Sequence, residues 1–250
     1  MQRTSEHSED ERLSDLMRDI VYILKDDIQT EELRYSLRSI EKNFPYRFVW
    51  FVGGQPKGLK PDRLIRHSQL GANKWLKIKS SMLEVVKQEE LSDEFFLFND
   101  DFFVTKPFEM EFVNFTDRTL SDRIEDFRKE NPHLNRYAMT LVQTEEELKA
   151  QGYGTLNFEV HLPMLFEKNK VEAALRSCFS PQMRSIYGNL TGCKVIDRRD
   201  VKVNSLSDIP HGMDFVSTND TTFAYGNVGR YIKDLFKEPS RFEQNGQGVE

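Results

Sequence analysis

The chain has 250 residues, of which 38% are hydrophobic and 12% aromatic, including 19 phenylalanines. This length and composition predict one α/β domain around an aromatic-rich core, with room for a small insertion. The net charge of -6 argues against nucleic-acid binding, which favours a basic face. The two cysteines, Cys178 and Cys193, imply no disulfide framework. Because no stretch is typical of a signal peptide or a membrane span, we expect a cytoplasmic protein.

The first hundred residues alternate between predicted strands and predicted helices. They begin with a polar, acidic segment at 1–14, which we expect to be flexible, before a single domain at 15–250. The predicted elements are a strand at 19–24, a helix at 31–40 capped by Thr30, a strand at 47–52, a helix at 75–90 and a strand at 95–99. This alternation predicts a mostly parallel, Rossmann-like sheet flanked by helices, with right-handed crossovers.

The rest of the chain is less regular and carries more charge. The segment 108–150 is a candidate cap over a ligand site. The other predicted elements are helices at 122–130, 144–150, 168–178, 181–187 and 228–236, and an apolar run at 215–220 that ends in polar residues.

The most informative stretch is 94–104, in which Asn99, Asp100 and Asp101 stand between two phenylalanine-rich runs. A buried strand has no favourable place for adjacent carboxylates, so we expect these acids at its carboxyl end. In α/β sheets that edge binds ligands, and acids there commonly hold Mg²⁺ or Mn²⁺, which in turn binds phosphate oxygens. The alternative is a strand, an Asn-Asp-Asp turn and a second strand, since Asn and Asp are favoured in turns.

Three charged residues lie on the first predicted helix, whose N-terminus should lie at the same edge of the sheet. Glu32 is in its first turn and is a candidate catalytic residue, and Arg34 and Arg38 share one face of the helix. Arg34 and Arg38, together with Asn99, are the expected substrate-binding residues, because guanidinium groups near a helix N-terminus favour an anion. The alternative is a solvated surface of Glu and Arg with weak pairing.

Two further residues are candidates for catalysis. His161 is the one histidine of five in hydrophobic sequence, where burial and orientation can tune it as a general base. A core histidine with satisfied hydrogen bonds is the alternative. Arg184 is a candidate phosphate clamp, because guanidinium pairs bidentately with phosphate oxygens. For Asn219 and Asp220, an N-cap or turn is favoured over a second acidic corner.

Two blocks of this sequence together resemble the Stealth family, which includes bacterial capsular polysaccharide phosphotransferases and the lysosomal N-acetylglucosamine-1-phosphotransferase. They are Glu32-Leu-Arg-Tyr-Ser-Leu-Arg-Ser-Ile-Glu-Lys-Asn43 and Phe95-Phe-Leu-Phe-Asn-Asp-Asp-Phe-Phe103. The resemblance covers residues 19–104, and the segment 161–184 resembles a later, His-containing region of the family more loosely.

The resemblance implies transfer of a sugar-1-phosphate from a nucleotide-sugar donor to a hydroxyl of a glycan acceptor, in surface polysaccharide biosynthesis. It also implies a fold similar to the GT-A-like transferases that use nucleotide-sugars. Glu32, Asp100 and Asp101 would then lie at the donor and the divalent metal. His161 would take the proton of the acceptor, and Arg184 would stabilise charge on the transferred phosphate.

The sequence departs from the family's pattern in two places. Residues 23–27 stand where members have a Trp-Val-Asp-Gly-type loop, and residues 71–74 replace the usual Phe-Asn-Ser. Two other functions therefore stay open: a metal-dependent glycosyltransferase that forms a glycosidic bond, and a non-catalytic glycan-binding module. Peripheral association with membrane-bound polysaccharide machinery is compatible with the first interpretation, and the sequence indicates no oligomeric state.

Overall fold

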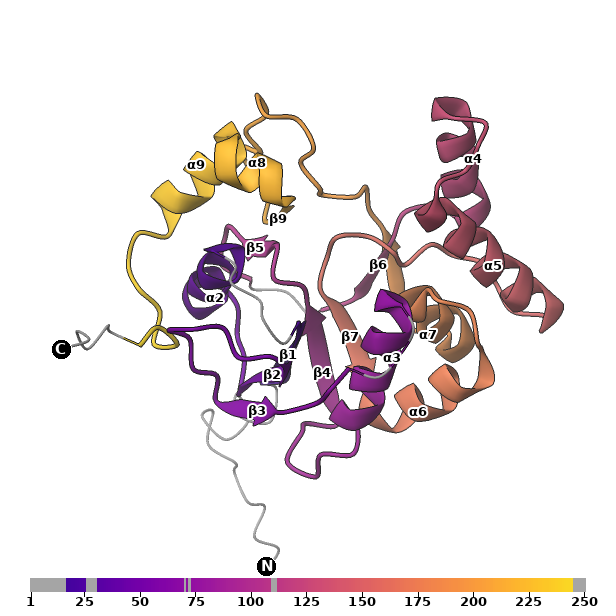
Figure 1. Cartoon of the computed structure of the whole chain (residues 1–250), viewed down its shortest axis with the longest axis horizontal. Coiled ribbons are helices and arrows are strands. Elements are labelled where there is room, and N and C mark those ends of the chain that lie inside the picture. Colours follow the sequence, from indigo (N-terminus) through magenta and orange to yellow (C-terminus); the bar gives the residue numbers. More distant parts are fainter. Residues whose placement is uncertain (1–16, 26–30, 70, 72, 109–111, 245–250) are drawn as a thin grey trace, which may run out of the picture.

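The structure is a computed structural model that describes residues 17–25, 31–69, 71, 73–108 and 112–244 (Figure 1). Three features of the sequence lie outside these residues. They are the tail at 1–14, the expected helix cap Thr30, and the acids Asp26 and Asp27 that follow the first strand.

A central sheet of five strands confirms the predicted α/β fold, in the order β3-β2-β1-β4-β7 (Figure 1). The strands are β1 (Asp19–Leu24), β2 (Val49–Gly53), β3 (Arg63–Ile65), β4 (Glu94–Phe98) and β7 (Met164–Glu167). The first four are parallel, as predicted, and Ile20 of β1 pairs with Val49 on one side and Phe96 on the other. The sequence pattern did not predict β3 or the antiparallel edge strand β7.

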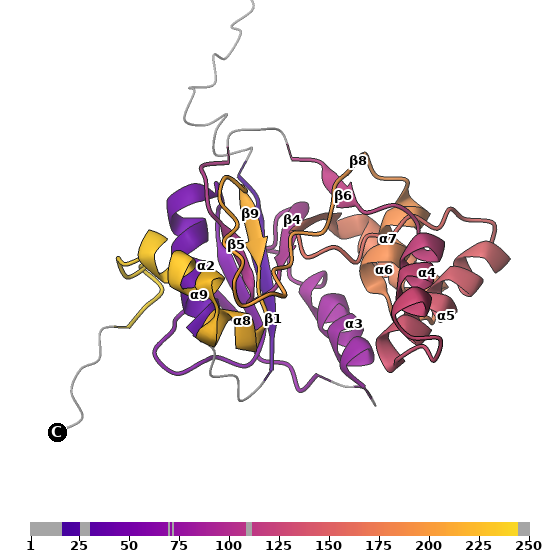
Figure 2. The ribbon, with the colours of Figure 1, turned by 90° about the horizontal axis from the view of Figure 1, so that it is seen from above.

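Alternate side chains of the strands face two hydrophobic layers. Ile20 and Tyr22 pack with Leu33 of α2 on one face, and Val21 packs with Met82 of α3 on the other. The helices that cover the sheet are α2 (Glu31–Asn43) on the first face and α3 (Lys74–Val85), α6 (Lys168–Ser177) and α7 (Met183–Thr191) on the second. Figure 2 shows α2 and α3 on opposite sides of the strands. Burial on both faces explains the nearly continuous apolar runs of β1, β2 and β4.

The segment 108–150 contains two helices that pack against each other. They are α4 (Leu120–Glu130) and α5 (Arg136–Ala150). Leu120 of α4, Leu141 of α5 and Ile186 of α7 belong to one buried cluster, so the pair rests on α7. The predicted helix at 122–130 is confirmed, whereas the one expected at 144–150 is the second half of a longer helix. Its first half buries small and polar groups, including Ala138 and Thr140, which weakens the apolar periodicity.

Two small sheets and two short helices complete the described part of the chain. They are β5 (Phe102–Val104) with β9 (Phe215–Ser217), β6 (Asn114–Thr116) with β8 (Val195–Asp197), α8 (Asp220–Tyr225) and α9 (Asn227–Leu235). The Asn219 side chain accepts hydrogen bonds from the N–H groups of Thr221 and Thr222, which confirms the favoured N-cap. The expected last helix is α9.

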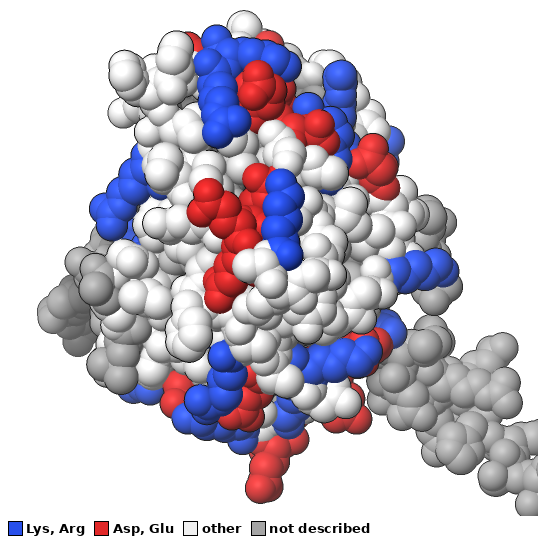
Figure 3. Space-filling view, turned by 90° about the vertical axis from the view of Figure 1, so that its right-hand side faces the viewer, with Lys and Arg blue, Asp and Glu red and all other residues white. Residues whose placement is uncertain are grey.

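None of the described helices is long and apolar enough to cross a bilayer. Figure 3 shows the face that lies to the right in Figure 1, where acidic and basic side chains are interspersed rather than separated. A nucleic-acid-binding surface more often presents a continuous basic stripe. The expectation that this protein binds no nucleic acid stays a prediction.

Candidate functional site

The strand order of the central sheet reverses between β1 and β4. From β1 the chain continues through α2 to β2 on one side, and it later returns to place β4 on the other side. In open α/β sheets, ligands bind at this switch point, outside the carboxyl ends of the strands. Asn99, Asp100 and Asp101 follow β4 directly, and Lys25 follows β1. The acids singled out from the sequence therefore lie where this topology favours a ligand.

The backbone at this point forms a turn, with the N–H of Phe102 donating to the carbonyl of Asn99 at 3.2 Å. The alternative of strand, turn and strand thus describes the local chain correctly. However, β5 does not return along β4 as a hairpin; it pairs with β9 and lies against α2, where Ser36 donates to the Phe102 carbonyl at 2.6 Å. A turn and a ligand site are compatible here, because the turn carries its acids to the switch point.

Glu32, Asp100 and Asp101, which we call the acid group, lie close enough to repel one another. Glu32 is only 6% exposed, and its Oε1 accepts a hydrogen bond from Thr218 at 2.6 Å. Burial, followed by the charges of Asp101 and Asp100, raises the pKa of Glu32 to about 7. Burial and the charge of Asp101 raise the pKa of Asp100 to about 6. A bound cation would relieve this repulsion, so the arrangement favours one.

Asp101 has one carboxylate oxygen left for a ligand. Its Oδ2 accepts hydrogen bonds from Lys202 at 3.3 Å and from Ser217 at 3.1 Å. Its Oδ1 is buried and has no hydrogen-bond partner among the described residues. A buried carboxylate oxygen without a partner is costly, and a bound ion is one common explanation.

The acid group fits a metal ion that is held jointly with a substrate. Within the described ranges, no three His, Cys, Asp or Glu side chains are placed to hold a metal ion by themselves. Mg²⁺, however, is usually bound by one or two carboxylates together with waters and substrate phosphates. The buried Oδ1 of Asp101 and the partly exposed Asp100 supply such a pair.

The structure brings Arg184 into contact with Asn99, although they are far apart in the sequence. Arg184 is 7% exposed and donates to the Asn99 side-chain oxygen at 3.1 Å and to the Leu162 carbonyl at 2.6 Å. Its guanidinium lies 5.4 Å from the centre of the Phe102 ring. Burial lowers the pKa of Arg184, while Glu159 and Asp101 oppose that shift. An arginine retains its charge even so, and it holds that charge at the edge of the acid group.

His161 forms a dyad with Asp200, which the sequence did not single out. The ring Nδ1 lies 2.8 Å from Asp200 Oδ2, and the backbone N–H of His161 donates to Asp200 Oδ1 at 3.1 Å. Burial raises the pKa of Asp200, but the hydrogen bonds and charge of His161 outweigh it and leave the pKa lowered. Because Asp200 is ionised, Nδ1 carries the proton and Nε2 is left as the basic nitrogen. The side chain is 28% exposed, so His161 is not a fully buried core residue.

One pocket is lined by Asn99, His161 and Arg184, whereas Asp100 and Asp101 are not part of its wall. The α3–α7 pocket, as we name it, has a volume of about 200 Å³. Its wall includes the polar and aromatic side chains of Trp75, Asn99, Tyr137, Glu159, His161 and Arg184. Tyr137 belongs to α5, so the segment expected to form a cap contributes one wall of this pocket. The function of that segment as a movable cap stays a prediction.

Arg34 and Arg38 bind an internal anion in this structure. Both guanidinium groups contact Glu243, at 2.7 Å from Arg34 and at 2.7 and 2.8 Å from Arg38. Arg38 also donates to the carbonyl of Phe236 at 2.9 Å. These contacts tie the C-terminal segment to α2. They differ from the solvated surface that was the alternative, and a role in substrate binding stays a prediction.

Sequence reasoning missed four residues of the site, namely Glu159, Asp200, Lys202 and Thr218. Glu159, Lys202 and Thr218 follow or interrupt short apolar runs, and Asp200 lies in a charged stretch; both patterns are too common to single a residue out. Thr218 alone had a usable signal, because it directly follows the apolar run at 215–217. The roles of the other three depend on contacts with residues that are distant in the sequence and that only the folded structure brings together.

Comparisons with known proteins assign nothing further to this chain. No family model matches it, and no curated protein matches it. The function of this chain is therefore inferred from the geometry of the site and from the resemblance of the two sequence blocks.

Proposed function

We propose that this protein is a transferase that moves a sugar-1-phosphate from a nucleotide-sugar to a hydroxyl group of a glycan acceptor. One observation carries the proposal: a histidine base and a buried arginine line one pocket, and the arginine lies close to an acid at the switch point of the sheet. His161, Arg184 and Asn99 line one pocket, and Arg184 lies close enough to Asp101 for their charges to interact. Phosphoryl transfer needs little more than positioning, charge neutralisation and a base.

His161 would act as the general base on the acceptor. Asp200 fixes the ring through Nδ1 and stabilises the imidazolium that forms when Nε2 takes the proton. A positioned base of this kind contributes on the order of 10²–10⁴ in rate. The pair lies beside the pocket and not in the hydrophobic core, which supports this role over a structural one.

Arg184 would stabilise negative charge on the transferred phosphate. It is already desolvated, and its position is fixed by Asn99 and the Leu162 carbonyl, so it would need little reorganisation during the reaction. Asp101 and Asp100 are the residues that would hold Mg²⁺ or Mn²⁺, which would neutralise the diphosphate of the donor. Lys202 places a further positive charge next to Asp101.

The experiment that tests the proposal is product analysis. Purified protein is incubated with a panel of nucleotide-sugars, Mg²⁺ or Mn²⁺ and glycan acceptors, and products are followed by ³¹P NMR and nucleotide chromatography. We expect release of a nucleoside monophosphate and formation of a phosphodiester. Release of a nucleoside diphosphate with a glycoside would instead show a glycosyltransferase. Failure of every nucleotide-sugar to bind would favour a glycan-binding module.

Variants separate the catalytic groups from the fold. We expect His161→Ala and Asp101→Asn each to lower turnover by about 100-fold or more, with melting temperatures close to that of the parent protein. His133→Ala and Asp234→Asn are matched controls, because both side chains are exposed and lie outside the site. Near-normal turnover of His161→Ala or Asp101→Asn would contradict the assignment.

A further inference from the structure

The α3–α7 pocket extends beyond the groups that the proposed reaction uses. Besides His161 and Arg184, its wall includes Trp75 and Tyr137, which come from the first turns of α3 and α5. Figure 2 places α3 between the sheet and the helices α4–α7, so this part of the pocket lies between separate elements of the fold. A volume of about 200 Å³ is the space of about seven water molecules, which suits one sugar unit rather than a whole nucleotide-sugar.

The two aromatic side chains give this part of the pocket the chemistry of a sugar site. Trp75 and Tyr137 are both partly exposed and face the same space. The C–H face of a sugar ring packs well on an aromatic ring, since it buries apolar area while the hydroxyl groups stay hydrogen-bonded. Polar groups of the same wall, among them Asn99 and Glu159, are available to orient such a ring.

Two cations stand over Trp75 without a matching acid. Lys74 Nζ lies 4.9 Å from the Trp75 ring centre, and the guanidinium of Arg136 lies 5.5 Å from it. Neither group forms a salt bridge within the described part of the chain. Arg136 belongs to α5 and Trp75 to α3, so the contact joins the two elements at a residue that lines the pocket, and both cations are exposed.

The acid in the pocket wall has its own charge balance. Glu159 accepts hydrogen bonds from the N–H and hydroxyl of Ser185 at 3.0 and 3.1 Å, and its charge interacts with that of Arg184. This acid is therefore compensated, while the positive charge beside Trp75 is not. A ligand that complements this pocket has a sugar ring next to the aromatic side chains and a negative charge next to Lys74 and Arg136.

We propose that the α3–α7 pocket is the acceptor site and that its acceptor is an anionic glycan. In this arrangement, a sugar ring lies on Trp75 and Tyr137 and directs a hydroxyl toward His161. A negative group on the same sugar or on the next one contacts Lys74 and Arg136. The inference rests on the proposed function for the identity of the reaction, but the site itself can be tested by binding alone.

The test measures binding of size-matched oligosaccharides by calorimetry, with no donor present. One series is neutral, one carries carboxylates and one is linked by phosphodiesters. We expect both charged series to bind about fivefold to tenfold more tightly than the neutral one at low salt, and this preference to shrink as salt is added. A preference for only one charged series would identify the source of the charge. Equal binding of the neutral and charged series would overturn the inference.

Variants assign the two contributions to separate residues. Trp75→Ala should abolish detectable binding of all series, while Lys74→Gln with Arg136→Gln should remove only the preference for charge. Lys77→Gln with Arg128→Gln is the matched control, because both groups are exposed, lie on α3 and α4, and do not line the pocket. Loss of the charge preference in this control would show that net charge, and not the pocket, selects the glycan.

Two outcomes distinguish the inference from the proposed function. Binding of anionic glycans in a protein that binds no nucleotide-sugar would support the pocket assignment and refute the transferase. Turnover of a nucleotide-sugar that neither Trp75→Ala nor the double substitution of Lys74 and Arg136 affects would support the transferase and refute the pocket assignment.

Discussion

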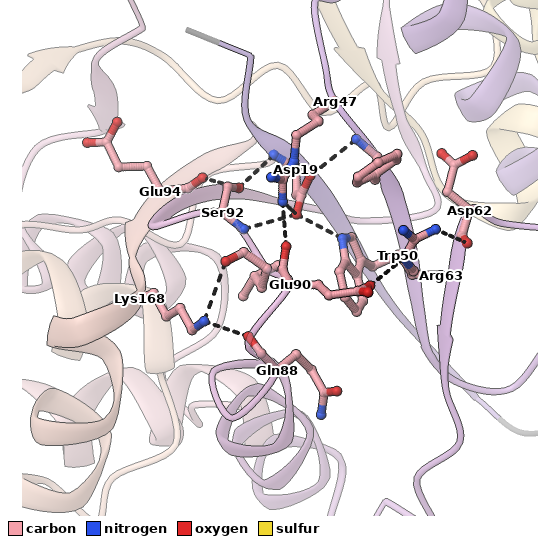
Figure 4. A network of polar contacts seen from close by, with 12 residues as sticks. Asp19, Arg47, Trp50, Asp62, Arg63, Gln88, Glu90, Ser92, Glu94 and Lys168 are labelled. Atoms are coloured by element: carbon pink, nitrogen blue, oxygen red, sulfur yellow. Dashed lines mark hydrogen bonds and ion pairs between the residues drawn. The ribbon is translucent and has the colours of Figure 1, made fainter. Parts of the chain in front are cut away.

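At the amino ends of the strands, Asp19 is fully buried, and its carboxylate accepts five hydrogen bonds within this network (Figure 4). Arg47 binds it bidentately at 2.9 and 2.8 Å, and Trp50 Nε1 donates at 2.9 Å. At the carboxyl ends, by contrast, Asp101 has one buried oxygen with no partner among the described residues. The same sheet therefore satisfies one carboxylate completely and leaves another open.

This contrast separates a structural acid from a ligand-binding one. A buried carboxylate with several donors fixes the geometry around it, and here it ties β1 to β2 and to the loop before β4. Carboxylates that repel each other destabilise the empty fold, which a protein tolerates where a ligand restores the balance. Ion pairs alone do not identify a site, because a carboxylate with five hydrogen bonds lies at the opposite edge of the sheet.

The largest effect is expected from removing the structural acid. Asp19→Ala leaves Arg47 and the Trp50 and Ser92 N–H groups without their acceptor, so we expect a loss of roughly 3–5 kcal/mol in the free energy of unfolding. Urea titration followed by circular dichroism measures it. Arg63→Gln is the matched control, since its ion pair with Glu90 is exposed and should contribute less than about 1 kcal/mol. Equal losses in the two variants would contradict the structural role of Asp19.

A smaller loss in the free energy of unfolding is expected from a substitution at Glu243. The same substitution tests whether Arg34 and Arg38 stabilise the fold or bind substrate. Burial raises the pKa of Glu243, but the hydrogen bonds from Arg38 and Arg34 outweigh it and lower the pKa to about 2 from an ordinary 4.5. Its contribution to stability is therefore present above pH 4.5 and is lost as the pH falls toward 2. We expect Glu243→Gln to lower the free energy of unfolding at pH 7 by about 2 kcal/mol.

A control variant and a measurement of donor binding complete this test. Glu238→Gln should change little, because that side chain is exposed. If Arg34 and Arg38 serve the fold alone, Glu243→Gln leaves nucleotide-sugar affinity unchanged, as measured by calorimetry. A clear gain in donor affinity would show that Glu243 occupies a phosphate site, which would return both arginines to the substrate-binding residues expected from the sequence.

The sequence was sufficient for the features that depend on local patterns. The apolar run of β1 and the spacing of Leu33 and Leu37 in α2 predict the strand and helix that the structure shows. The acids after β4 were placed correctly, because adjacent carboxylates do not fit inside a buried strand. Because β4 lies beside β1 in the sheet, residues that follow β4 lie at the switch point.

The partners of these residues could not be predicted, because they are distant in the chain. Asp200 lies 39 residues from His161, and Glu243 lies 205 residues from Arg38. Their contacts depend on how the loops after β8 and α9 return to the sheet. The antiparallel direction of β7 could not be predicted either, because the sequence of a four-residue strand does not indicate its direction in the sheet.

The smallest change in the free energy of unfolding is expected in the acid group. Unlike the two substitutions above, a substitution there should stabilise the protein. The pKa of Glu32 is about 7 in the fold against an ordinary 4.5, so between these values the folded state binds more protons than the unfolded chain. Stability from this group is full below pH 4.5 and falls as the pH rises to about 7. We therefore expect Glu32→Gln to stabilise the metal-free protein by about 1 kcal/mol at pH 8 and to change it little at pH 4.5.

Thermal unfolding at the two pH values, with and without Mg²⁺ and a nucleotide-sugar, measures this difference. Glu31→Gln is the matched control in the same turn of α2, because its ion pair with Lys233 is exposed on the Glu31 side and should contribute less than about 1 kcal/mol. The parent protein should gain more from Mg²⁺ with the donor than Glu32→Gln does, since the parent has three mutually repelling carboxylates and the variant keeps only Asp100 and Asp101. Destabilisation of Glu32→Gln at pH 8 would place Glu32 with Asp19, as an acid whose hydrogen bonds serve the fold.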